Sequence, residues 1–328
     1  MTAALAIQGL ATTFATPAGV VRAVDGIDLE LRPGEVLGLV GESGSGKSVT
    51  LRSLVRLVRA PGRIEGRALW QGRDLLAMPE KELQDVRGKE IAMIFQEPMT
   101  ALNPVLTVHQ QIDENLQAHT GLGRAERRQR AIELLDLVGI ASAAERLNAY
   151  PHQFSGGMRQ RVMIAIALAS EPRLLLADEP TTALDVTIQD QILKLLLDLR
   201  DRLGMSVILV THDLGVVAQT CDRVAVMYAG RILEVGRVVE VFRQPRHAYT
   251  LGLLGSIPSG GAIRQPLRSI EGAPPSLVGL PQGCAFAPRC SFVTDACRAR
   301  RPDLVRVGAD HTSSCIHHEQ VAAAGLAP

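Results

Sequence analysis

Residues 35–48 read Glu35-Val36-Leu37-Gly38-Leu39-Val40 and then Gly41-Glu42-Ser43-Gly44-Ser45-Gly46-Lys47-Ser48. The first part is a compact apolar run of the kind that forms a buried strand, and the second is a glycine-rich turn. From Val49 to Val58, apolar and basic residues recur at helical spacing. The turn fits the pattern GxxxxGK[ST] between a strand and a helix, which is the context that this pattern requires. The stretch therefore predicts an α/β fold built around an anion-binding loop.

The loop residues have the chemistry that a nucleoside triphosphate needs. Glycines let successive backbone N–H groups point inward around a β-phosphate at the start of a helix. Lys47 would bring a cation to the β- and γ-phosphates, and Ser48 would offer a hydroxyl to Mg²⁺. The alternative is a glycine-rich turn without a ligand. The residues expected to contact ATP are Gly41, Glu42, Ser43, Gly44, Ser45, Gly46, Lys47, Ser48 and Val49.

A second apolar run, residues 174–177, ends in two acidic residues, Asp178 and Glu179. A carboxylate at the end of a strand can hold Mg²⁺, and its neighbour can orient or deprotonate a water for in-line attack on the γ-phosphorus. We expect Asp178 to take the metal role and Glu179 the role of the base. Acidic residues also cap strands without a catalytic role, but the phosphate-binding loop in the same chain favours the catalytic interpretation.

Length and composition exclude several classes of protein. The chain has 328 residues, enough for about two domains with a buried core. Its 35 Lys and Arg residues against 34 Asp and Glu residues give a net charge of +1, so we expect no nucleic acid partner. No apolar run reaches the roughly 18 residues of a membrane helix, and the N-terminus lacks the basic region of a signal peptide. We therefore expect a cytosolic location, where disulfides are rare.

The rest of the chain alternates between strand and helix patterns. Residues 4–40 indicate short strands and turns, 105–149 look helical throughout, and the strand-like run 206–210 follows a helix expected over about 187–202. Such alternation predicts a mostly parallel sheet, with the segment 105–149 inserted as a helical lobe. After about Ser256, Gly, Pro and short apolar pieces dominate, and we place a domain boundary there.

Further motifs complete a pattern along the chain. Ser155-Gly156-Gly157 precedes an apolar helix, so it is either a second helix N-terminus suited to an anion or an ordinary helix cap. The motifs, in order, are the loop at 41–48, Gln96, Ser155-Gly156-Gly157, Asp178-Glu179, Ala183-Leu184-Asp185 and Thr211-His212-Asp213. Together and in this order they resemble those of an ATP-binding cassette (ABC) ATPase.

This resemblance implies roles for individual residues. Two cassettes are expected to close head to tail, so that the signature at 155–157 of one touches the ATP held by the other. Gln96 would sense Mg²⁺ and the membrane subunit, His212 would contact the γ-phosphate, and Asp185 would lie at the seam between cassettes. Phe14, the sole aromatic residue before the loop, is the candidate to stack on adenine, with a core position as the alternative. The expected Mg²⁺ ligands are Ser48, Gln96 and Asp178, and the expected catalytic residues are Gln96, Glu179 and His212.

Finer features are similar to the ATPases of dipeptide, oligopeptide and nickel importers over nearly the whole chain. The segments that carry this likeness are 96–104, 150–161, 179–187 and 226–230. Pro245-Arg246-His247-Ala248-Tyr249-Thr250 resembles the His-Pro-Tyr-Thr motif of that group, with Ala248 where proline is usual.

The fold that the resemblance implies is an ABC cassette. It consists of a RecA-like parallel-sheet core, an antiparallel β subdomain and an inserted helical subdomain. The expected domains are an ATPase domain at 1–255, with its helical subdomain at about 99–170, and a small C-terminal extension at 256–328.

The function that the resemblance implies is ATP hydrolysis that powers the import of di- or oligopeptides. The expected partners are a second ATPase subunit, commonly a paralogue, two transmembrane permease subunits and an extracytoplasmic solute-binding protein, at the cytoplasmic face of a bacterial inner membrane. Import of nickel, glutathione or sugar stays open, because the other subunits select the solute.

Two alternatives belong to other classes. A soluble ABC ATPase acting on DNA or ribosomes is disfavoured by the single cassette and the lack of basic excess. A regulatory iron–sulfur protein with a vestigial ATPase is disfavoured by the intact Glu179 and His212.

Four of the five cysteines, Cys284, Cys290, Cys297 and Cys315, lie in the last 45 residues. Their spacing lacks the CxxC pairs of a zinc ribbon, so spacing alone leaves both a metal site and buried structural thiols open. The arrangement resembles the C-terminal extension of peptide-importer ATPases, where four such cysteines can hold a [4Fe-4S] cluster. The resemblance therefore implies this cluster, with zinc or no metal as alternatives, and a structural role for it in fastening the tail.

Overall fold

The computed structural model describes residues 3–97, 101–182, 184–256 and 269–325. The chain divides into two compact units. Unit 1 comprises residues 32–35 and 77–210, and unit 2 comprises residues 3–31, 36–76 and the chain from 211 onward. Each unit is described by itself. The expected domain boundary after Ser256 adjoins residues 257–268, which lie outside the described ranges.

Unit 2 begins with an antiparallel sheet in the order β2-β1-β4-β5. Its strands are β1 (Leu5–Thr16), β2 (Gly19–Leu31), β4 (Gly62–Trp70) and β5 (Arg73–Asp74). The expectation of short strands and turns over 4–40 was wrong, because β1 and β2 are 12 and 13 residues long. Register shifts between Ile7 and Thr13 interrupt the apolar alternation of one continuous strand, which made it resemble several short ones.

The predicted strand, loop and helix at 36–54 are present in unit 2. All five residues of β3 (Val36–Val40) are buried, and β3 runs parallel to β9 (Arg223–Tyr228). Strand β10 (Arg231–Arg237) pairs antiparallel with β9 and with β12 (Thr312–Ser313), which pairs with β11 (Val305–Arg306). The helix after the loop, α1 (Lys47–Leu54), ends four residues before the expected position.

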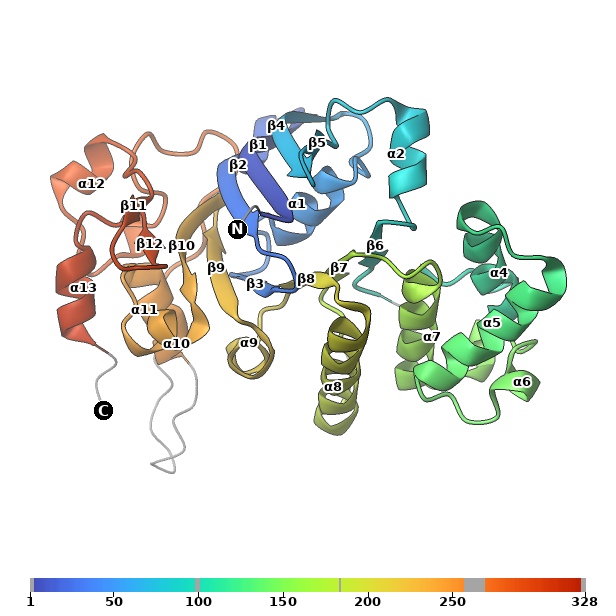
Figure 1. Cartoon of the computed structure of the whole chain (residues 1–328). Helices are drawn as coiled ribbons and strands as arrows, with labels where there is room; N and C mark the ends of the chain where they lie inside the picture. The colour runs from blue at the N-terminus through green and yellow to red at the C-terminus, as the bar shows by residue number, and fades with distance from the viewer. Residues whose placement is uncertain (1–2, 98–100, 183, 257–268, 326–328) are drawn as a thin grey trace. The chain divides into compact units, whose positions relative to one another are not determined.

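Among the other helices of unit 2, α10 packs against β9 and β10, α9 contacts β3 and α10, and α11 contacts α13; α10, α11 and α13 lie beside β10 (Figure 1). They are α9 (Leu214–Thr220), α10 (Val238–Arg243), α11 (Ala248–Gly255), α12 (Asp295–Ala299) and α13 (His318–Ala324), with a 3-10 turn at Ala287–Arg289. Tyr228, Tyr249 and Phe286 are buried in the same apolar cluster as Val321 of α13. The C-terminal residues therefore share a core with the strands of unit 2.

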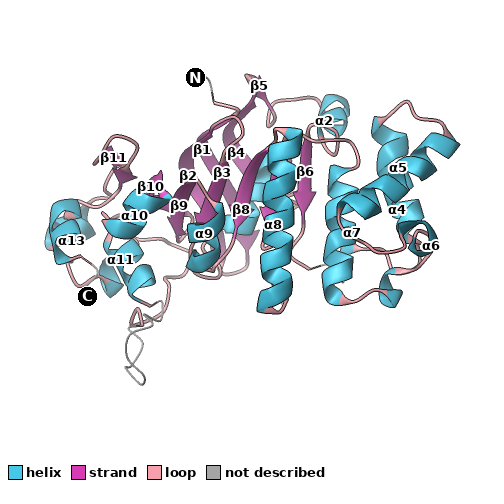
Figure 2. Cartoon of the chain, turned by 60° about the horizontal axis from the view of Figure 1, so that its bottom comes forward, coloured by secondary structure: helices cyan, strands magenta, loops and turns pink. Residues whose placement is uncertain are grey.

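Unit 1 contains three parallel strands in the order β8-β7-β6. They are β6 (Ile91–Ile94), β7 (Leu174–Asp178) and β8 (Ser206–Val210). Residues of β7 and β8 are buried throughout, as expected for parallel strands covered on both faces. The long helix α8 (Val186–Leu203) connects β7 and β8 and buries Ile192, Leu196 and Leu199 along one face (Figure 2).

A lobe of helices follows β6 in unit 1. The helices of this part are α4 (Val108–His119), α5 (Arg124–Leu137), α6 (Ala143–Arg146) and α7 (Gly156–Leu168), with a 3-10 turn at Pro151–Gln153; α2 (Glu80–Val86) precedes β6. The segment 105–149 is therefore not helical throughout. A capping box at Thr107 and Gln110 begins α4, and Gly139 follows the end of α5 with a positive φ of 74°.

Candidate nucleotide-binding site

Two glycines determine the shape of the loop between β3 and α1 in unit 2. A Cβ atom at Gly41 would lie 2.0 Å from the carbonyl oxygen of Met227, and one at Gly46 would lie 2.2 Å from that of Ala23. Any side chain would displace backbone at either position. Gly46 is the N-cap of α1 and brings no capping side chain. The start of α1 therefore has the open geometry of an anion-binding helix N-terminus.

Lys47 is held along this loop. Its Nζ donates hydrogen bonds to the carbonyl oxygens of Gly41 at 2.7 Å and Glu42 at 2.9 Å. The side chain is buried, so its ammonium group is confined to the loop. This position allows the charge to act on phosphates bound by the loop amides.

In unit 1, Glu179 follows the end of β7 and contacts Gln96, which lies two residues after the end of β6. Asp178 is fully buried as the last residue of β7, and Glu179 follows it with a positive φ of 48°. The Nε2 of Gln96 donates to Glu179 Oε2 at 3.1 Å, so two of the predicted catalytic residues are in contact. Thr182 Oγ1 donates to the same oxygen at 2.7 Å. Sequence reasoning assigned Thr182 no role, although it stands three residues after the predicted base.

The signature and the start of α8 are neighbours in unit 1. Ser155 is the N-cap of α7, and its Oγ accepts a hydrogen bond from the N–H of Met158 at 3.3 Å. Asp185 is the N-cap of α8 and accepts from the N–H of Ile188 at 2.9 Å. Ser155 and Asp185 are both exposed. Ala183, part of the same motif, lies outside the described residues, as do 98–100 after Gln96.

Two further predicted residues lie in unit 2. His212 is exposed, just before α9, whose N-cap Asp213 accepts from the N–H of Gly215 at 2.7 Å. Phe14 is half-buried on β1, and its ring lies against Gly62, where a Cβ would approach it to 2.8 Å. The ring thus packs on its own sheet.

The structure describes all five cysteines, and none forms a disulfide. Cys284, Cys290 and Cys315 pack against the apolar cluster of unit 2, and the N–H of Cys284 donates to the carbonyl oxygen of Cys297 at 2.8 Å. Burial raises the pKa of Cys284 and Cys290, and that of Cys315 to about 11. Within the described ranges, no group of three or more His, Cys, Asp or Glu side chains is arranged to hold a metal ion. The structure therefore does not support the predicted [4Fe-4S] cluster.

Known proteins share these sequence features. Residues 24–182 match the family described as ABC transporter, and residues 233–297 match the family described as oligopeptide/dipeptide transporter, C-terminal region. A putative peptide import ATP-binding protein of Brucella melitensis is 52% identical over 97% of this chain and 98% of its own length. The oligopeptide transport ATP-binding protein OppD of Bacillus subtilis is 51% identical over 95% of this chain and 88% of its own. The chain belongs to the ATP-binding subunits of peptide-type ABC transporters.

Solved structures of ABC cassettes have the same fold as this ABC subunit. The ATP-binding cassette MJ0796, in a dimeric structure bound to ADP and Pi, is 30% identical and covers 71% of this chain and 98% of its own, with a TM-score of 0.65. The protein cbiO1 of Clostridium perfringens, part of an ABC transporter complex, is 29% identical and covers 74% of this chain and 91% of its own, with a TM-score of 0.62. These findings confirm the predicted fold class, and the family makes the chain an ATPase coupled to transport.

Among the described residues of this ABC subunit, no helix has both the length and the apolar character needed to cross a bilayer.

Proposed function

We propose that this chain is the ATP-hydrolysing subunit that powers the import of di- or oligopeptides through an ABC transporter. One observation carries the proposal. The relatives named as peptide import and oligopeptide transport proteins match at about half of all positions, and they match along nearly the whole chain rather than in the cassette alone. The match of residues 233–297 to the oligopeptide/dipeptide C-terminal family points to the same class of solute.

The residues of unit 2 would bind the triphosphate of ATP. The loop amides and the N-terminus of α1 would donate to the phosphate oxygens, and the ammonium group of Lys47 would exchange its carbonyl partners for the β- and γ-phosphates. Ser48 would provide one oxygen ligand to Mg²⁺, and oxygen is the ligand atom that this ion prefers. The sequence motifs propose Asp178 and Gln96 as further ligands. When bound, Mg²⁺ neutralises charge on the β- and γ-phosphate oxygens.

The exposed His212 would contact the γ-phosphate, and Phe14 would stack on adenine.

The residues of unit 1 would activate the attacking water. Glu179 would accept its proton as the general base. Hydrogen bonds from Gln96 and Thr182 converge on one oxygen of this carboxylate, so its orientation is fixed from two sides. Thr182 is a positioning residue in this scheme, because it acts through Glu179.

A second ATPase chain would complete the reaction. The exposed N-terminus of α7 at Ser155 and Gly156, and the exposed Asp185, are the surface that would meet the ATP and the loop of that second chain. The dimeric structure of the similar cassette MJ0796 supports this arrangement. We propose a paralogue as the second ATPase, two membrane permeases, an extracytoplasmic binding protein that selects peptides, and a location at the cytoplasmic face of the membrane.

The test is hydrolysis and transport in vesicles that contain the permeases, both ATPase chains and the binding protein. We expect wild type to hydrolyse ATP and to take up a radiolabelled tripeptide. Glu179→Gln should lower the turnover of ATP by about a hundredfold or more while ATP binding persists, because the base is lost and the loop is not. Glu171→Gln is the matched control, since the side chain of Glu171 is exposed and its carboxylate forms an ion pair with Arg130.

Two results would contradict the proposal. Unchanged ATP turnover in Glu179→Gln would show that Glu179 is not the general base. ATP-dependent uptake of nickel, glutathione or a sugar, without uptake of peptide, would show that the solute is not a peptide.

We also propose that Cys284, Cys290, Cys297 and Cys315 hold a [4Fe-4S] cluster. Four thiolates are the usual ligand set of this cluster, and four of the five thiols of this chain lie in one C-terminal region. The arrangement of the side chains described above does not by itself favour the cluster, which has no catalytic role in this proposal.

A further inference from the structure

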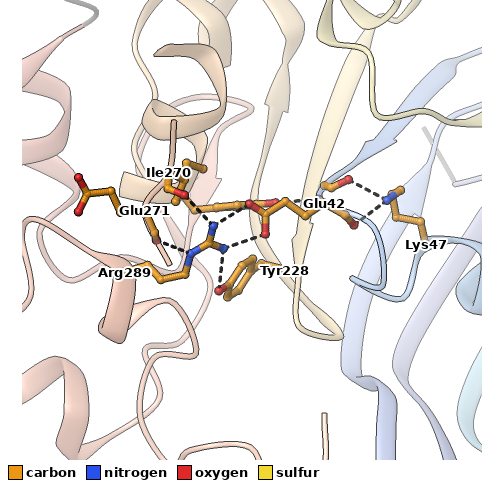
Figure 3. A network of polar contacts seen from close by, with 8 residues as sticks. Glu42, Lys47, Tyr228, Ile270, Glu271 and Arg289 are labelled. Atoms are coloured by element: carbon orange, nitrogen blue, oxygen red, sulfur yellow. Dashed lines mark hydrogen bonds and ion pairs between the residues drawn. The ribbon is translucent and has the colours of Figure 1, made fainter. Parts of the chain in front are cut away.

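Glu42, the second residue of the phosphate-binding loop, is bound from several directions. Its carbonyl oxygen accepts from Lys47, and its N–H donates to the hydroxyl oxygen of Tyr249 at 2.8 Å. Its carboxylate forms an ion pair with Arg289 of the C-terminal region, 247 residues away in sequence (Figure 3). Both partners lie in unit 2. The shape of the loop at Glu42 thus depends on two residues that follow the cassette motifs.

Arg289 uses its whole guanidinium group in this contact. Its Nη1 and Nη2 donate to the two carboxylate oxygens of Glu42 at 2.8 and 3.0 Å, the bidentate geometry that gives the strongest pairs. The remaining N–H groups donate to the hydroxyl of Tyr228 at 3.2 Å and to the carbonyl oxygens of Ile270 at 3.2 Å and Glu271 at 3.0 Å. All five donors of the guanidinium are therefore engaged. Such a side chain is fixed in one orientation.

The pair lies at the edge of an aromatic cluster. The side chain of Arg289 is 6% exposed and that of Glu42 is 25% exposed. The guanidinium carbon lies 5.8 Å from the ring centre of Tyr228 and 5.9 Å from that of Phe286, which pack edge to face. Low exposure weakens solvent screening, so the charges of the pair interact more strongly than a surface pair would. The hydrogen bonds from Arg289 to Glu42 also raise the pKa of the guanidinium, which stays charged.

The carboxylate of Glu42 would repel the phosphates that the loop is proposed to bind. Glu42 brings a negative charge to a segment that has to accept a triphosphate, and like charges at short range repel. Arg289 compensates that charge and holds the carboxylate on the side of the C-terminal region, where Ile270 and Glu271 also anchor the guanidinium.

We propose that Arg289 is a positioning residue for ATP binding, which neutralises Glu42 and keeps its carboxylate turned toward the C-terminal region. The C-terminal region then contributes a residue to the nucleotide site. The inference rests on the proposed role of the loop around Lys47. A purely structural tie between tail and loop is the competing explanation, and it predicts a different pattern among variants.

The test is equilibrium binding of MgATP to the purified full chain by isothermal titration. Every variant carries Glu179→Gln, so that the nucleotide is not consumed. We expect Arg289→Met to raise the Kd for MgATP about tenfold, because Glu42 is left uncompensated beside the phosphates. Adding Glu42→Gln to Arg289→Met should restore most of the affinity. Glu42→Gln alone should bind MgATP more tightly than the parent, because the negative charge is removed while the cation of Arg289 remains. A structural tie would instead weaken binding in both single variants.

Controls separate the inference from the proposed function. Arg298→Met removes an exposed arginine of the same region that pairs with Asp295, and should leave the Kd unchanged. Lys47→Ala should abolish binding. If it binds MgATP like the parent, both the loop assignment and the inference fail. If it loses binding while Arg289→Met stays within twofold of the parent, the inference alone fails.

Two further results test the electrostatic role of Arg289. A double variant as weak as Arg289→Met would overturn the electrostatic role. Should Arg289→Met not fold, the Kd of Glu42→Gln provides the test, since a lower Kd than the parent's supports the inference and an unchanged or higher Kd contradicts it.

Discussion

His247 stands at the N-terminus of α11 with its imidazole fully buried. Its Nδ1 accepts a hydrogen bond from the N–H of Tyr249 at 3.0 Å, and among the described residues its Nε2 has no hydrogen-bond partner. Burial lowers the pKa of this imidazole from 6.5 to about 3. The folded chain therefore keeps His247 neutral over a range of pH in which the unfolded chain protonates it.

This difference predicts a loss of stability in acid. Between pH 6.5 and 3 the unfolded state binds the extra proton, so the free energy of unfolding falls as the pH falls, by about 1.4 kcal/mol per pH unit at most. His247→Asn keeps an acceptor for the helix cap and removes the titrating group. We expect the Tm of wild type to drop more than that of His247→Asn between pH 7.5 and 5.0, measured by circular dichroism. The exposed His152→Asn should behave like wild type, and equal acid losses in all three proteins would refute the prediction.

Residue roles were predictable where the chemistry is local in sequence. The loop at 41–48 and the pair Asp178 and Glu179 are each contiguous, so type and spacing alone indicated their roles. The pair of Glu42 and Arg289 joins residues 247 positions apart, and no local pattern distinguishes Arg289 from other arginines. Such contacts are set by packing of the whole unit, which a single sequence does not display.

At the scale of elements, the first turn of α7 contains two adjacent glycines, Gly156 and Gly157, with different surroundings. A Cβ at Gly157 would lie 2.7 Å from Cγ2 of Ile188 in α8, whereas a Cβ at Gly156 would come no closer than 3.9 Å to Leu184. Gly156 is exposed, and both glycines are helical. Substitutions at the two positions therefore distinguish the effect of packing between α7 and α8 from the effect of contacts at the exposed surface.

Alanine at each position should give opposite results. Gly157→Ala forces α7 and α8 apart and should cost about 1–3 kcal/mol of stability, seen as a lower Tm. Gly156→Ala should keep or slightly raise the Tm, because alanine favours helix over glycine by up to about 1 kcal/mol. If the signature meets the ATP of a second chain, Gly156→Ala should nevertheless lose most ATPase activity in vesicles. Full ATPase activity of Gly156→Ala would show that the surface at Gly156 does not contact the ATP of a second chain.

The element boundaries show where sequence patterns mislead. Strands β3, β7 and β8 are short, apolar and bounded by turns, and their positions were predicted closely. Helix α8 exceeds its predicted range by one residue at each end. The helical lobe was harder, because the turns on either side of α5, at residues 121–123 and 138–140, interrupt the helical pattern for only a few glycine and apolar residues. Composition alone therefore could not separate helix from turn there.

At the scale of the whole molecule, protein contacts fasten the C-terminal region to the rest of unit 2. Strand β12 pairs with β10, and the fully buried Glu234 of β10 contacts Nε2 of His311 at 2.6 Å. The same carboxylate accepts from the N–H groups of Arg246 and His247 at 2.6 and 3.0 Å. These contacts, with the pair of Arg289 and Glu42, hold the region in place by themselves.

The proposed cluster would then add to an attachment that already exists, and its removal should leave the fold intact. We expect the chain isolated without oxygen to contain about four irons and four sulfides, with broad absorption near roughly 400 nm. Cys290→Ser should lose this absorption and most of the iron, and its Tm should fall by no more than a few degrees, because Glu234 and Arg289 still anchor the region. Cys221→Ser is the control and should keep the full iron content, since Cys221 is not one of the four C-terminal cysteines and its sulfur lies beside Gly38. Iron-free wild-type protein, with zinc absent as well, would show that the four cysteines are buried structural thiols.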